Sequence, residues 1–468
     1  MGRTSIIMVM AFNLIFMTMG FRLSSLTSSA YDKYMTYYSI EQAGLAAESG
    51  ANIAISNSYW SRWTALPTAQ FSSGTGIQGT IQFADTAVSS SSGSGDTIGF
   101  HLTSTASDNY STVITRVSVQ GQSFAQFGIF NSSENGISWG ASDTCFGPYH
   151  TQDNMTCQGT PRFYGQVTTN GSITGGSPYF KFPPTPKTNI PLDGSFDDLK
   201  AWGSTAKGGA NYTGVKVFVE FYNNGQIKVQ TVTNASTSDG WLASGTGFST
   251  GSIKACTTYA NVGELTSSGV LLVNNSELHV KGVLENVNLT LGCIGTGSIV
   301  MIDSSLVYKE SPPDSRNKFA VTNSMLGIVA QNGINVTDTQ HPSTSTTQTD
   351  GVTPTVKNYA IANNNNNNNL KGVTINATMY SSNGGFGAEN FKTRGDCGTL
   401  RVVGGIQELT REAVKYPSTG DGFDKSYDYD LNLQYNTPKG YPSTRFLIKN
   451  WVDSTIITNN TFWQGENQ

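Results

Sequence analysis

Charged residues are scarce in this chain. Its 468 residues include 28 Lys and Arg and 32 Asp and Glu, so charged residues make up 13% and the formal net charge is −4. Soluble domains usually carry about 25% charged residues. A protein that binds nucleic acid through bulk charge needs a basic surface, so the composition excludes that class. We therefore expect no nucleic-acid partner.

Residues that bind metals are also rare. The sequence has 4 His and 5 Cys, with no Cys-x-x-Cys pair and no cluster of Cys with His. A structural zinc site needs four convergent ligands at characteristic spacings. The aspartates within residues 421–430 lack the alternating pattern of a calcium loop. The sequence therefore predicts no metal site and no cofactor.

Patterns that indicate catalysis are equally sparse. No pair of carboxylates stands apart as a general acid and base, and residues 140–144 do not form a nucleophile elbow. His150 is the best single candidate, because histidine titrates near neutral pH. A buried histidine that hydrogen-bonds a turn is the simpler interpretation. We expect a protein that is not an enzyme.

The polarity of the chain comes from Ser, Thr, Asn and Gly, which suits an extracellular protein. Disulfides are stable in that environment. Cys145 and Cys157 enclose a short loop and are the first candidate pair, and Cys256 with Cys293 is the second. Buried free thiols are the alternative for all four.

The most informative segment is the apolar N-terminus. Residues 5–21 (SIIMVMAFNLIFMTMGF) carry no formal charge. As a helix they would reach about 25 Å, slightly less than the ~30 Å hydrocarbon core of a membrane. Three interpretations compete. They are a cleaved signal peptide, which Arg3, Ser28 and Ala30 would suit, a membrane anchor, and a helix that moves from the membrane into a filament core.

The residues that follow favour the third interpretation. Residues 31–55 contain no proline and keep helical spacing. Tyrosines recur first and a stripe of small residues comes next, which would let a sheet or a helix approach closely. The two sets are Tyr31, Tyr34 and Tyr38, then Ala43, Ala47, Gly50 and Ala54. We therefore predict one long helix over residues 1–57, with residues 5–21 as its apolar part.

After Trp63 the sequence predicts β structure. Period-two alternation occurs at 77–83, 111–120 and 215–222, and the last run precedes an Asn-Gly hairpin turn. Short strands follow at even spacing over 268–307 and return at 326–338 and 373–382. This spacing is typical of β-helix-like coils or stacked sandwiches. The expected fold class is α+β: a long N-terminal helix, then a large mainly-β body with β-helix-like coils plus β-sandwich or hairpin elements.

Proline and low-complexity segments predict how the body is divided. Residues 183–191 are rich in proline and would link a first β-rich lobe, 58–182, to a second, 192–468. Residues 341–355 are rich in Ser, Thr and Gln, and residues 363–369 are all asparagine. We expect both segments to be surface loops.

Residues 4–58 resemble the long N-terminal helix of type IV pilins and minor pilins, most clearly at YYSIEQAGLAAESGANIAI. Most such pilins carry a glutamate five residues into the mature chain, where this chain has Ser5 if Met1 is the first mature residue. The body resembles an uncharacterised bacterial family that has a prepilin-type N-terminus and a β-rich ectodomain. The matching blocks are 146–169, 268–291, 324–336, 373–391, 398–414 and 422–430.

The resemblance implies a structural subunit of an extracellular type IV pilus-like filament on the cell surface. Its partners would be other copies of itself and, before extrusion, the assembly machinery of the inner membrane. The alternatives are a low-copy minor pilin or tip adhesin, and a membrane-anchored β-helix protein that binds or processes carbohydrate. The predicted filament-core residues are Ile6, Ile7, Met8, Val9, Met10, Phe12, Asn13, Leu14, Ile15, Phe16 and Phe21.

Overall fold

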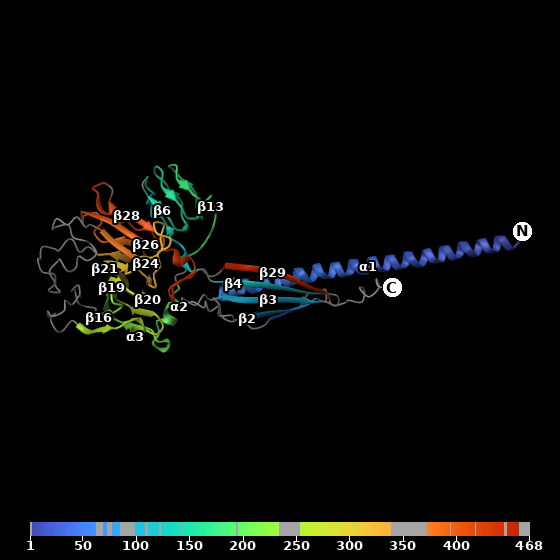
Figure 1. Cartoon of the computed structure of the whole chain (residues 1–468), viewed down its shortest axis with the longest axis horizontal. Helices are drawn as coiled ribbons and strands as arrows, with labels where there is room; N and C mark the ends of the chain where they lie inside the picture. The colour runs from blue at the N-terminus through green and yellow to red at the C-terminus, as the bar shows by residue number, and fades with distance from the viewer. Residues whose placement is uncertain are drawn as a thin grey trace. The chain divides into compact units, whose positions relative to one another are not determined.

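The computed structural model describes residues 2–61, 69–72, 77–84, 99–107, 111–120, 123–141, 143–192, 195–233, 253–337, 372–393, 395–416, 418–443 and 447–457. They form two compact units, which are drawn in Figure 1. Unit 1 comprises Met1–Ser89, Thr97–Gly121 and Arg445–Gln468. Unit 2 comprises Ser90–Asp96 and Gln122–Thr444. A long helix therefore precedes a large mainly-β body, as the sequence predicts.

Unit 1 begins with one continuous helix, α1 (Gly2–Ser61), of 60 residues. It passes through the threonines of its apolar half without a break. The hydroxyl of Thr18 donates to the carbonyl oxygen of Leu14 at 2.9 Å, and that of Thr27 donates to Leu23 at 2.8 Å. These bonds satisfy polar groups within the helix itself. The prediction of a single N-terminal helix is confirmed.

The sheet of unit 1 has five antiparallel strands in the order β1-β2-β3-β4-β29. Their bounds are β1 Ala69–Ser72, β2 Gln78–Ala84, β3 Gly99–Ser107, β4 Ser111–Gln120 and β29 Leu447–Ile457. The edge strand β29 comes from the end of the chain and pairs with β4 over its whole length. The larger segment of unit 2, Gln122–Thr444, is thus inserted in the chain between the neighbouring strands β4 and β29 of unit 1.

The stripe of small residues packs α1 on this sheet. Ala43 and Ala47 are fully buried and form one cluster with Ile77, Ala106 and Val113. The helix contacts β2, β3 and β4, and the hydroxyls of Ser39 and Ser111 hydrogen-bond at 2.8 Å. Alanine on the inner face brings the helix close enough to the strands for such contacts. Figure 1 shows the other end of α1 extending away from the sheet.

Unit 2 is built from stacked coils. Strands two apart in the chain pair in parallel, so that β18, β20, β22, β24 and β26 form one ladder. Strands β19, β21, β23 and β25 form a second ladder. The bounds are β18 Val270–Asn274, β19 Glu277–Leu284, β20 Asn288–Ile294, β21 Ile299–Tyr308, β22 Met325–Ala330, β23 Ile334–Val336, β24 Gly372–Ser381, β25 Phe386–Ala388 and β26 Asp396–Thr410. Leu271, Leu291 and Ile328, from three successive coils, stack in the core.

A second run of coils, built from shorter strands, lies nearer the start of unit 2. The strands are β5 Ile129–Ser133, β6 Thr144–Cys145, β7 Tyr149–Thr151, β8 Met155–Thr156, β9 Arg162–Phe163, β10 Val167–Thr169, β11 Ile173–Thr174, β12 Tyr179–Phe180 and β13 Thr185–Pro186. Parallel pairs join β6 to β9 and β9 to β12, and likewise β7 to β10 and β10 to β13. Aromatic rings stack along these coils, with Phe163 and Phe180 at 5.3 Å.

The remaining strands include antiparallel elements. Strands β15 (Val215–Phe221), β16 (Ile227–Thr233) and β17 (Ile253–Tyr259) form a meander, and the predicted turn follows β15, with Gly225 at φ +82°. A positive φ is the reason that the turn uses glycine. The others are β14 Ala210–Thr213, β27 Lys415–Tyr416 and β28 Asp421–Asp428, with helices α2 Asp197–Trp202 and α3 Val262–Leu265 and short 3-10 turns at Phe124–Gln126, Thr205–Lys207 and Leu431–Gln434.

The two compact units have different bounds from the two β-rich lobes that the sequence predicted, 58–182 and 192–468. The range 58–182 is divided between unit 1 and unit 2. The proline-rich segment 183–191 contains β13, whose Thr185 pairs with Thr168 of β10, so this segment belongs to the stack. Proline is tolerated there because it lies in the last strand of its ladder. The expected loops 341–355 and 363–369 lie outside the described residues.

Candidate functional site

The N-terminal half of α1 presents apolar side chains to solvent in the single chain. From Ile6 to Leu26 the exposed fractions of its large apolar side chains lie between 52% for Ile15 and 69% for Leu23. The exposed residues include every predicted filament-core residue: Ile6, Ile7, Met8, Val9, Met10, Phe12, Asn13, Leu14, Ile15, Phe16 and Phe21. They surround the helix on all sides. A helix that is apolar all round is normally buried in lipid or among other helices.

The length of this apolar segment (residues 5–21) suits a membrane. The helix contains an 18-residue window with a mean hydropathy of 1.9, none of it buried, and is long and apolar enough to cross a membrane. Arg3 and Arg22 lie on either side of the apolar segment. At a rise of ~1.5 Å per residue their Cα atoms are about 28 Å apart, close to the ~30 Å hydrocarbon thickness.

An aromatic face continues beyond the apolar segment. Tyr31, Tyr34 and Tyr37 are each more than 60% exposed, and the rings of Tyr34 and Tyr38 lie 6.4 Å apart. Beyond Ser39 the opposite side of the helix is buried against the sheet. The exposed surface of α1 is therefore apolar first and aromatic next. Contiguous exposed surface of this kind indicates an interaction site.

Unit 2 contains a buried cluster of charged and aromatic groups. Arg411 Nη1 lies 2.7 Å from Glu134 Oε2, and both side chains are over 90% buried. The guanidinium lies 4.4 Å from the centre of the Trp139 ring. The Tyr149 hydroxyl and the Asn131 amide both donate to the other oxygen of Glu134. Since each charge has a close partner, removing one of them would leave the other buried and unpaired, which is strongly destabilising.

Glu408 lies beside this cluster and is fully buried. Burial raises the pKa of its carboxyl to about 8, with Arg411 opposing the shift and Glu134 and Glu412 adding to it. The backbone N–H of Phe386 donates to it at 2.7 Å. A space of ≈ 10 Å³ lies beside these groups and Lys425, which is room for about one water molecule. We therefore expect this carboxyl to be largely protonated at neutral pH in the folded chain.

We expect Glu408→Gln to flatten the pH dependence of stability. The folded pKa of about 8 lies above the usual 4.5, so the folded state binds more protons between these values and the free energy of unfolding falls as pH rises through them. Because glutamine cannot ionise, the free energy of unfolding of the variant should not fall in this way as the pH rises. Denaturant titrations at several pH values between about 5 and 8 measure it. An unchanged slope in the variant would show that Glu408 is already ionised.

His150, the best single catalytic candidate from the sequence, is a core residue. It lies on β7, and its Nδ1 is 2.7 Å from the hydroxyl of Thr168 on the neighbouring coil. The rings of Phe127 and Phe130 lie close to it. Burial lowers its pKa to about 4, so the ring is neutral. The structure supports the simpler interpretation of a buried, hydrogen-bonded histidine, although its partner lies on strand β10 and not in a turn.

The aspartates of 421–430 each have a different partner. Asp424 pairs with Lys415, Asp428 accepts from Ser315 at 2.5 Å, and Asp430 caps the turn that begins at Leu431. Among the described residues no group of three or more acidic, Cys or His side chains converges on a metal position.

The structure forms neither predicted disulfide. Cys145, Cys157 and Cys293 are buried thiols, and Cys256 is an exposed one. Burial raises the pKa of Cys145 to about 12 and of Cys157 to about 11. The two thiols pack with Trp139 and Tyr149 in one apolar cluster. The alternative from the sequence, buried thiols, therefore describes Cys145 and Cys157.

Comparison with known proteins adds little to this geometry. No family model matches the chain, and no curated protein matches it. Among solved structures it is similar to the competence-associated pilin ComZ from Thermus thermophilus, with 11% identity and a TM-score of 0.31. That alignment covers 89% of this chain and 97% of the pilin. A match with so low a TM-score and identity does not define the function of this chain.

Proposed function

We propose that this chain is a structural subunit of an extracellular type IV pilus-like filament, held together by the apolar segment of α1. The observation that carries the proposal is the division of α1. One part is buried on its own sheet through Ala43 and Ala47, while residues 2–28 are exposed all round. The apolar side chains of the first half are removed from water only when other helices or lipid cover them.

The energetics favour association through this segment. Burying one large apolar side chain contributes about 1.5–3 kcal/mol, and ten such residues lie between Ile6 and Phe21 in the predicted core. Asn13 lies among them and is exposed in the single chain. In a helical core its amide needs a hydrogen-bond partner, because an unpaired buried amide costs about 1–3 kcal/mol.

A filament explains more of α1 than a membrane anchor does. An anchor accounts for the ~28 Å between Arg3 and Arg22 but not for the exposed tyrosines that follow. Tyr31, Tyr34 and Tyr37 lie beyond the segment that lipid would cover. In a filament they would contact neighbouring subunits. Before extrusion the same segment would hold the chain in the inner membrane, within reach of the assembly machinery.

The proposal is tested by locating the chain and by deleting the exposed half of its helix. We expect filaments sheared from cells to contain the full chain as their main protein. Deleting residues 2–28 should abolish incorporation but leave unit 1 folded, because Ser39, Ala43 and Ala47 still pack on the sheet. A low-copy minor pilin would instead appear as a trace component.

Two outcomes would contradict the filament. The full chain would be an anchor if it stayed wholly in the membrane fraction while no filaments carried it. If the shortened chain still polymerised, contacts between the β-rich units would drive assembly.

A further inference from the structure

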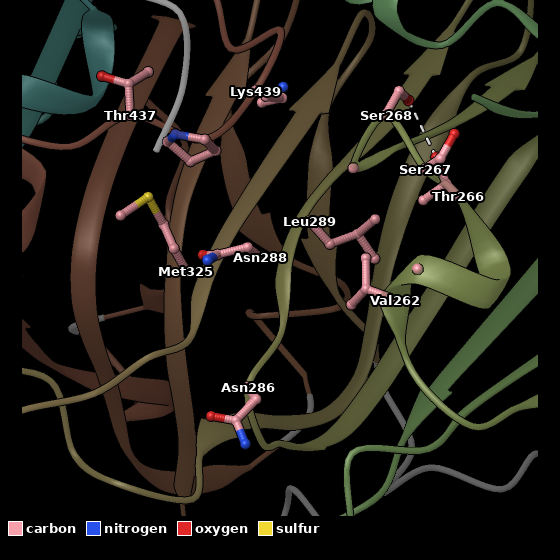
Figure 2. A pocket seen from close by; sticks show the side chains of 13 residues that line it. Val262, Thr266, Ser267, Ser268, Asn286, Asn288, Leu289, Met325, Thr437 and Lys439 are labelled. Atoms are coloured by element: carbon pink, nitrogen blue, oxygen red, sulfur yellow. Dashed lines mark hydrogen bonds between the residues drawn. The ribbon is translucent and has the colours of Figure 1, made fainter. Parts of the chain in front are cut away.

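Unit 2 contains a pocket of ≈ 320 Å³, shown in Figure 2. It lies where the parallel strands β18, β20 and β22 begin, with Asn288 and Met325 paired on adjacent strands. Helix α3 and the segment Thr437–Lys439 complete its wall. This volume is at the lower end of the range for small-molecule sites, about 300–1,000 Å³. A ligand of one or two rings would fill it.

The frame of the pocket is held by its own hydrogen bonds. The hydroxyl of Thr266 donates to the carbonyl oxygen of Gly208 at 2.9 Å and lies 3.1 Å from that of Ser268, the contact drawn as a dashed line in Figure 2. Ser268 in turn accepts from the backbone N–H of Val270. Asn261 caps α3 by accepting from Glu264. A frame fixed in this way is formed before any ligand binds, which reduces the cost of binding.

Other polar side chains in the wall are available to hydrogen-bond a ligand. Within the described part of the chain, the side chains of Ser267, Asn286, Asn288 and Thr437 line the pocket and have no partner in the protein. Each asparagine offers two donors and one acceptor, and each hydroxyl offers both functions. Together they match a ligand that carries several hydroxyl groups, each of which donates and accepts.

The rest of the wall is apolar and nearly without charge. Val262, Met325 and Pro438 contribute apolar surface, which suits the C–H face of a sugar ring, and Leu289 lies behind them in the core. Among the described residues that line it there is no carboxylate, and the one charged group is Lys439. Its ammonium lies 4.5 Å from the centre of the Trp202 ring. This cation already has a partner in the protein, and the other polar groups of the wall are uncharged hydroxyls and amides that suit a neutral ligand.

We propose that this pocket binds one or two rings of a neutral saccharide. The site would let the body of the chain attach to a glycan-bearing surface. The proposal rests on unit 2 alone, so its failure leaves the filament proposal untouched, and the reverse also holds. All lining residues belong to that unit.

The test uses the full chain in a detergent without sugar groups. Saturation-transfer NMR and calorimetry with maltose, cellobiose, lactose and N,N′-diacetylchitobiose should detect binding of at least one. Asn288→Ala should weaken it about 2- to 10-fold, the effect of losing one or two neutral hydrogen bonds. Asn288→Trp should fill the pocket and abolish binding.

Asn170→Ala is the matched control, because Asn170 is an exposed asparagine of unit 2 that does not line the pocket. It should bind as the natural chain does. The proposal is overturned if none of the four disaccharides binds, or if Asn288→Trp binds them normally. Glucose and glucuronate complete the set of probes as a matched neutral and anionic pair. Binding of glucuronate without binding of glucose or the disaccharides would overturn the neutral class and assign the role to Lys439.

Discussion

Phe12→Asp is expected to abolish filament formation while leaving the chain folded. Phe12 is 53% exposed in the single chain and its ring stacks on that of Phe16, within the helix. Its replacement therefore costs the folded monomer little. In a shared helical core the carboxylate would be buried without a partner. On membrane-insertion scales an aspartate at a helix centre costs about 2.5–3.5 kcal/mol, and each subunit of the polymer would bear that cost.

The measurement is electron microscopy of sheared filaments, with immunoblotting of the membrane and released fractions. Phe12→Leu is the control, because it keeps an apolar side chain of similar burial and should assemble normally. Circular dichroism should show the same β content in both variants. If Phe12→Asp formed filaments of normal number and length, the apolar segment would not lie in the core of the assembly.

The second large effect is expected at the buried ion pair. Arg411→Met should lower the free energy of unfolding by about 3–5 kcal/mol, because it leaves Glu134 buried without its cation. Arg411 Nη1 lies 2.7 Å from Glu134 Oε2, and the Arg411 guanidinium lies 4.4 Å from the centre of the Trp139 ring. A denaturant titration of the full chain, followed by circular dichroism, would show the shift of the β transition.

Two comparisons interpret this result. The double variant Glu134→Gln/Arg411→Met removes both charges and should recover most of the loss. Lys309→Met breaks an ion pair with Glu285 of the same length, 2.7 Å, but at the surface, where Lys309 is 48% exposed. Surface pairs contribute about 0–1 kcal/mol. If Arg411→Met cost no more than Lys309→Met, the cluster would not stabilise unit 2.

One regularity of unit 2 was visible in the sequence and missed. The segment Cys145–Thr156 and the segment Phe163–Thr174 align with Gly147 on Gly165 and Thr151 on Thr169. In the structure these segments are successive coils, with Cys145 paired with Phe163 and Met155 paired with Ile173. A search for internal repeats would have found this period. It would also have placed Cys145 and Cys157 within one coil.

What the sequence determined by itself is local. The helix α1 follows from its 3.6-residue spacing and lack of proline, and its buried side follows from the small residues Ala43 and Ala47. Strands such as β4 and β15 follow from alternation, and the Asn-Gly turn after β15 follows from the need for a positive φ. Each of these features depends on neighbours within a few residues, so the sequence pattern contains the cause.

Only the tertiary structure decided which distant segments meet. Strand β29 completes the sheet of unit 1 beside β4, Arg411 reaches Glu134 across 277 positions of the chain, and three strand starts converge with Thr437–Lys439 on the pocket. Such pairings depend on how the coils stack and on which apolar faces they bury together. Since many partners have suitable local patterns, the choice among them is made by packing of the whole chain.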